Sequence, residues 1–80
     1  MTVEQLIEML PFMAKSIIMH ASVIKAPVKD FLVVLAKNDN GQVDIALFKQ
    51  KKLIASATVP KNEVYRTLQA MVSTYVQTQN

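Results

Sequence analysis

The side chains that could perform chemistry in this sequence are few. The chain contains one histidine, His20, and no cysteine, which excludes a thiol nucleophile, a disulfide and the common cysteine-based zinc sites. His20 follows Ser16 by one helical turn, a spacing at which a histidine can activate a serine nucleophile. No acidic residue is placed to orient the imidazole, and pairs at this spacing are frequent by chance. We therefore predict that His20 is a surface or interface residue.

The carboxylates offer no better catalytic arrangement. Glu4 and Glu8 lie one turn apart on the polar side of a predicted helix, which is typical of a solvated surface. Asp39 and Asp44 are accounted for by a predicted turn and a cross-strand pair. The one glycine, Gly41, belongs to that turn, so the chain has no phosphate-binding glycine loop. The sequence predicts a protein that is not an enzyme and that uses no metal, cofactor or small-molecule substrate.

Length and composition favour one small globular domain. The 80 residues are 51% hydrophobic and 19% charged, too apolar for a disordered chain and short enough that we expect a single domain, 1–80. The net charge is +3, and eight of the nine basic residues are lysines. Small size and lysine usage suggest a regulatory or accessory protein of a bacterium or phage.

We expect a cytoplasmic protein without a targeting segment or a membrane span. The first ten residues carry two glutamates and no basic residue, unlike a secretory signal. The apolar stretch over 6–24 is interrupted by Glu8, Pro11, Lys15 and His20, and charges within a span are costly.

The N-terminal segment predicts a helix. Thr2 and Gln5 have the spacing of a capping box, in which each side chain bonds a backbone N–H of the other residue. Pro11 lies within the pattern, so we expect a kink or a break there. A continuous apolar stripe is formed by Val3, Leu6, Ile7, Leu10, Met13, Ala14, Ile17, Ile18 and Ala21.

The middle of the chain predicts three antiparallel strands. Residues 31–36 form a continuous apolar run, Asn40-Gly41 suits a two-residue hairpin turn, and residues 43–48 alternate as the returning strand. This register places Lys37 opposite Asp44, a favourable pair of charges. A third strand is expected over 53–59, after the polar turn 49–52.

The last segment, about 60–76, has the periodicity of an amphipathic helix with Pro60 at its first position. The predicted fold is therefore α+β in the order α-β-β-β-α, a three-stranded meander flanked by a Pro-kinked N-terminal helix and a C-terminal helix. This order is similar to that of double-stranded RNA-binding domains, which dock the basic start of their last helix on phosphates. The chain departs from that family, because it has only Pro60-Lys61-Asn62-Glu63 there.

The predicted sheet has two apolar faces, although an antiparallel sheet usually has one polar face that is exposed to water. Either the helices cover opposite faces, or one face is buried against another chain. The register places four candidate contact residues on one face: Leu32, Val34, Ile45 and Leu47. The leading prediction is therefore a non-enzymatic protein-interaction module that buries apolar surface, as a homodimer or with a protein partner.

The N-terminal helix offers a second candidate interface. Met9, Phe12 and Met19 fall within its polar arc and, with Ser16, follow the spacing of a coiled-coil seam. Two interpretations remain open: a helix buried on two sides, or a contact surface for a second chain. Methionine-rich surfaces adapt readily to partners.

The alternative prediction is a weak nucleic-acid-binding module. Its contacts would be basic residues around the polar turn 49–52 and the last helix: Lys49, Lys51, Lys52, Lys61 and Arg66. A carrier for a small apolar ligand held between sheet and helix is a third possibility.

Overall fold

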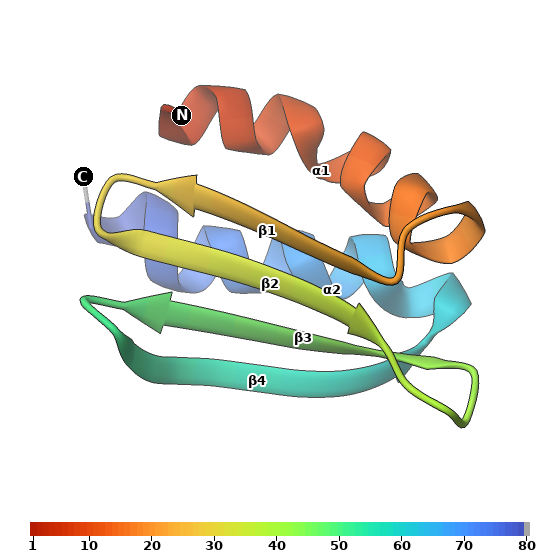
Figure 1. Cartoon of the computed structure of the whole chain (residues 1–80). Helices are drawn as coiled ribbons and strands as arrows, with labels where there is room; N and C mark the ends of the chain where they lie inside the picture. Colours follow the sequence, from red (N-terminus) through yellow and green to blue (C-terminus); the bar gives the residue numbers. More distant parts are fainter. Residues whose placement is uncertain (80) are drawn as a thin grey trace.

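The computed structural model describes residues 1–79 and shows two α-helices and a four-stranded antiparallel sheet (Figure 1). The bounds in chain order are α1 Val3–Met19, β1 Val23–Val28, β2 Phe31–Lys37, β3 Gln42–Lys49, β4 Lys52–Pro60, a 3₁₀ turn Lys61–Glu63 and α2 Val64–Met71. The helical path then continues through a π-helical segment, Val72–Val76, and a 3₁₀ turn, Gln77–Gln79. The α+β class is confirmed.

The start of α1 forms as its sequence predicts. The Thr2 backbone N–H donates to Gln5 Oε1 at 2.8 Å, and the Gln5 backbone N–H donates to Thr2 Oγ1 at 3.1 Å. This capping box satisfies donors that a helix start otherwise leaves unpaired. The helix is continuous through Pro11, so two separate helices are excluded. Pro11 is exposed, and water can hydrate the carbonyl that the proline leaves unbonded.

The prediction of three strands is wrong because it missed β1. A proline such as Pro27 indicates in the sequence that a helix has ended before it. In the structure α1 already ends at Met19, and residues Val23–Val28 around this proline form a strand. Pro27 is tolerated because β1 lies at the edge of the sheet, whose strand order is β1-β2-β3-β4. The observed order α-β-β-β-β-α therefore no longer matches that of double-stranded RNA-binding domains.

The hairpin between β2 and β3 has a three-residue loop, 39–41, and not the predicted two-residue turn, because the Asn38 backbone N–H donates to the Gln42 carbonyl at 3.0 Å. Lys37 pairs with Val43, and Ala36 pairs with Asp44, one residue away from the expected register. The Asn38 side chain explains the longer loop, because its Oδ1 accepts the backbone N–H groups of Asn40 and Gln42 at 2.9 and 3.1 Å. Gly41 supplies the positive φ of 76° that ends such a loop.

Both helices lie on one side of the sheet (Figure 1). This inner face of the sheet packs against the apolar sides of α1 and of the C-terminal helical segment. The prediction that Pro60 is the first residue of the last helix is wrong. Pro60 ends β4 and precedes the 3₁₀ turn. The buried core consists of Val3, Leu6, Leu10, Met13, Ala14, Ile17, Ala26, Val28, Phe31, Val33, Leu35, Val43, Ile45, Leu47, Val64, Leu68, Val72 and Val76.

Candidate interaction surfaces

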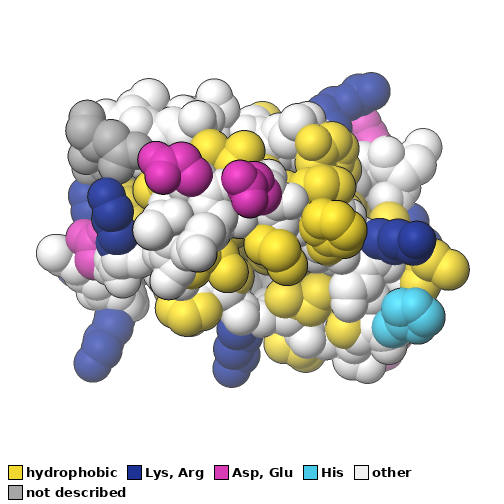
Figure 2. Space-filling view, turned by 90° about the horizontal axis from the view of Figure 1, so that it is seen from above, with side chains coloured by type: hydrophobic (Ala, Val, Ile, Leu, Met, Phe, Trp, Pro, Cys, Tyr) yellow, Lys and Arg dark blue, Asp and Glu magenta, His cyan; other side chains and the backbone are white. Residues whose placement is uncertain are grey.

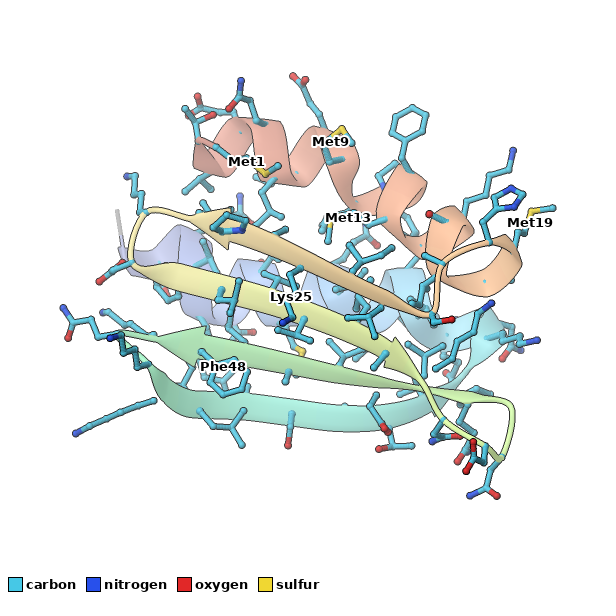
Figure 3. The ribbon with its side chains drawn as sticks, viewed as in Figure 1. Met1, Met9, Met13, Met19, Lys25 and Phe48 are labelled. Atoms are coloured by element: carbon cyan, nitrogen blue, oxygen red, sulfur yellow. The ribbon has the colours of Figure 1, made fainter. Side chains whose placement is uncertain are left out.

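The face of the sheet that points away from the helices, here called the outer face, is largely apolar and carries no covering element within residues 1–79. Strand pairing arranges its side chains in three rows across β1 to β4. The first row is Val23, Ala36, Asp44 and Thr58; the middle row is Lys25, Val34, Ala46 and Ser56; the third row is Pro27, Leu32, Phe48 and Leu53. Figure 3 shows Lys25 and Phe48 projecting from this face.

Polarity changes along the outer face. The third row is entirely apolar, and its Leu53 side chain is 56% exposed. At the opposite end, the carboxylate of Asp44 accepts the Thr58 hydroxyl at 2.7 Å and the Asn38 amide at 3.4 Å. An apolar area therefore covers one end and the middle of the face, and hydrogen-bonded polar groups occupy the other end.

The structure separates the four sheet residues that the sequence grouped together. Leu32 and Val34 lie half-buried on the outer face, whereas Ile45 and Leu47 are buried on the inner face against the helices. The one-residue difference in register is the cause, because successive side chains of a strand point to opposite faces. Three residues of the outer face, Pro27, Phe48 and Leu53, were not among the predicted contact residues.

The three residues of the second candidate interface, here called the line on α1, are all exposed to solvent. The exposed fractions are 41% for Met9, 64% for Phe12 and 59% for Met19. The interpretation of a helix buried on two sides is thereby excluded for the single chain. Figure 2 shows hydrophobic side chains gathered on this side of the molecule, and Figure 3 shows Met9 and Met19 pointing away from the sheet.

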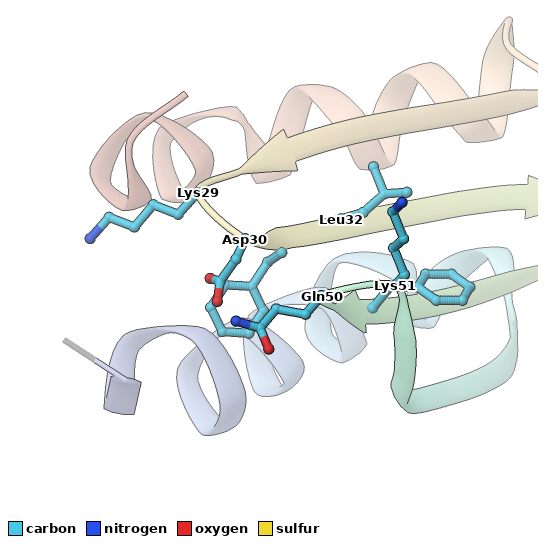
Figure 4. A pocket seen from close by; sticks show the side chains of 7 residues that line it. Lys29, Asp30, Leu32, Gln50 and Lys51 are labelled. Atoms are coloured by element: carbon cyan, nitrogen blue, oxygen red, sulfur yellow. The ribbon is translucent and has the colours of Figure 1, made fainter.

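A hollow of about 300 Å³ opens at the end of the sheet where the third row lies (Figure 4). Its apolar wall is made by Phe31, Leu32 and Phe48, and its rim by the two adjoining turns. The rim residues are Lys29, Asp30, Gln50 and Lys51. The Lys49 ammonium group lies 5.4 Å from the centre of the Phe31 ring, a cation–π distance.

The backbone around this hollow is strained. Lys29, Gln50 and Lys51 have positive φ angles of 55°, 50° and 70°. A left-handed conformation costs a residue with a side chain roughly 1–2 kcal/mol. The two central residues of the β3–β4 turn both adopt it, as a tight turn between twisted strands requires. Strain of this kind often accompanies functional surfaces, and here it borders the apolar end of the outer face.

The basic residues of the nucleic-acid alternative do not form one patch. Lys49, Lys51 and Lys52 lie at one end of β4, and Lys61 follows its other end. At 3.3 Å per residue these ends are roughly 30 Å apart. Arg66 is paired with Glu63 at 3.4 Å. The placement therefore offers two small basic sites on opposite ends of the sheet.

The described part of the chain contains no group of three or more histidine, aspartate or glutamate side chains that could hold a metal ion. Among its helices, none has the length and apolar character needed to cross a membrane. Ser16 and His20 are joined through the backbone, because the His20 N–H donates to the Ser16 carbonyl at 2.8 Å.

Neither a protein-family model nor a curated protein or solved structure matches this chain.

Proposed function

We propose that this protein is a small non-enzymatic interaction module that self-associates by burying the outer face of its sheet. One observation carries the proposal: both helices pack on the inner face, so the apolar outer face has no cover within the described chain. Antiparallel sheets normally alternate between a buried apolar face and a wet polar face. An apolar face of this extent is typical of an interaction site.

The charges at the two ends of the outer face favour a second copy as the partner. The end beside Phe48 is positive, because Lys29, Lys49, Lys51 and Lys52 outnumber Asp30, whereas at the other end Asp39 and Asp44 balance Lys37 and Lys61. Two copies stacked face to face with their ends exchanged place the lysines of each near the aspartates of the other. Such a pair has a two-fold axis that crosses the strands at the middle row, so each contact occurs twice.

The hollow beside Phe48 gives this interface a concave part. Its wall includes Leu32 and Phe48, which belong to the third row of the outer face. In Figure 4 the Lys51 side chain extends toward Leu32 at its rim. With the ends exchanged, Val23 and Ala36 of the second copy lie over Pro27 and Leu32 beside the hollow, and the lysine keeps its charge at the edge of the contact, in water.

The proposal is tested by comparing the solvent exposure of methyl groups with and without association. A soluble paramagnetic agent is added to methyl-labelled protein at low and high concentration. We expect Leu32, Val34 and Leu53 to become as protected at high concentration as the core residue Leu35 is at low concentration. Met9 and Met19 on α1 serve as the internal control and should stay accessible. Protection of the two methionines instead would move the interface to the helix and refute the assignment.

A further inference from the structure

The two edges of the sheet differ in a way that points to a second contact. β1 has six residues and carries Lys25 at its centre and Pro27, which cannot donate a backbone hydrogen bond. A central lysine and a proline are devices that prevent an edge strand from pairing with another chain. β4 has nine residues, and none from Leu53 to Val59 is charged or proline. The central lysine and the internal proline of β1 have no counterpart in β4, whose one irregularity lies near its start.

The uncharged part of β4 is regular except at Ile54, which has no pairing partner on β3. The irregularity in its pairing with β3 lies between Leu47 and Phe48, at the end where β4 begins. From Ala55 to Pro60 the pairing with Leu47 to Gln42 is continuous. This segment therefore presents an extended backbone with the unpaired N–H and C=O groups of an edge strand to the solvent.

We propose that β4 pairs antiparallel with β4 of a second copy, centred on Ser56, and that this pairing joins two face-to-face dimers into a tetramer. The inference rests on the proposed self-association of the outer face. Ser56 lies in the middle row, where the axis of the face-to-face dimer also passes. The two-fold axis of the strand pairing is perpendicular to the sheet, whereas that of the face-to-face dimer is parallel to it. The two axes therefore meet at a right angle, and four copies form a closed assembly.

Each of the two contacts supports the other. A single pairing of two short strands is a weak contact in water, because its hydrogen bonds replace those with the solvent. In the stacked dimer both layers present a β4 edge, so two pairings form together and the second is intramolecular. The assembly does not extend further, since Lys25 and Pro27 protect the outer edges of both layers.

The test needs a β4 position outside the proposed contact of the outer face. Ala57 pairs with the buried Ile45, so it lies on the inner face, and it is half-buried at the edge of the sheet. Ala57→Lys therefore gives β4 an inward-pointing charge, which hinders the pairing of edge strands, and leaves the outer face unchanged. Ala57→Val is the control, because valine favours strands and adds no charge.

The experiment measures mass by light scattering and amide hydrogen exchange by NMR over a concentration series. We expect wild type and Ala57→Val to pass from 18.0 to 36.0 kDa, two and four times the 9.0 kDa of one chain. Ala57→Lys should remain at 18.0 kDa, twice the same chain mass. Amides of β4 that do not bond to β3 should exchange at least about tenfold more slowly in the tetramer.

Three results would overturn the inference, and they separate it from the proposed function. A wild-type protein that stops at twice 9.0 kDa with unprotected β4 amides would refute the strand pairing and leave the face-to-face dimer standing. A tetramer that survives Ala57→Lys would show that another surface joins the dimers. A protein that stays at 9.0 kDa would refute the proposed self-association and the strand pairing together.

Discussion

Phe48→Asp is expected to weaken self-association by roughly 10²- to 10⁴-fold. Phe48 lies in the apolar third row and lines the hollow beside it. Phe48 is half-buried in the single chain, so its further burial contributes only part of the about 1.5–3 kcal/mol of a large apolar side chain. Burying the carboxylate of the variant adds a desolvation cost, and a two-fold interface contains the residue twice. The expected loss is therefore about 3–6 kcal/mol, at about 1.4 kcal/mol per factor of ten. The new carboxylate also faces the aspartate end of the partner.

Phe12→Asp is the matched control for this experiment. It makes the same chemical change on α1, where Phe12 is more exposed than any other large hydrophobic residue among those described. We expect no change in the dissociation constant, measured by sedimentation of both variants. If Phe12→Asp dissociates the protein and Phe48→Asp does not, the line on α1 is the interface and the proposed face is wrong.

Leu35→Ala is expected to cost about 2–5 kcal/mol of folding free energy, the usual range for a fully buried leucine. Leu35 is 0% exposed at the centre of β2. A domain of this length has a total stability of only about 4–12 kcal/mol, so the variant should be close to unfolding. The chain has no tryptophan, and urea unfolding is best followed by far-ultraviolet circular dichroism.

Leu53→Ala provides the comparison for stability. Leu53 lies on the outer face and is 56% exposed, so its truncation should change the free energy of unfolding by no more than about 0.5 kcal/mol. Both measurements belong at concentrations where the protein is monomeric, since association stabilises the folded state. Equal losses for the two variants would mean that the inner and outer faces of the sheet do not differ in burial.

Local signals predicted the helices and the main hairpin. The capping box at Thr2 and Gln5 and the 3.6-residue periodicity of both helical segments depend on neighbours in the sequence. The structure shows the first helix where expected and the second from Val64, after a 3₁₀ turn, and not from Pro60. The exposure of Met9, Phe12 and Met19 also follows from that periodicity.

The fourth strand and the register could not be derived in the same way. A proline such as Pro27 argues against a strand unless the strand lies at the edge of a sheet. The sequence of the segment does not tell where it lies, because an edge position depends on how the whole sheet is arranged. The register depends on two hydrogen bonds to the Asn38 side chain that lengthen the loop by one residue. That difference decided which residues form the outer face.

The self-association of the protein is tested most directly by its mass in solution, measured by light scattering during size-exclusion chromatography. We expect a multiple of the 9.0 kDa chain mass that rises with concentration and persists at high salt, because burial of apolar surface is not screened by ions. A mass of 9.0 kDa at every concentration and in both low and high salt would contradict the account.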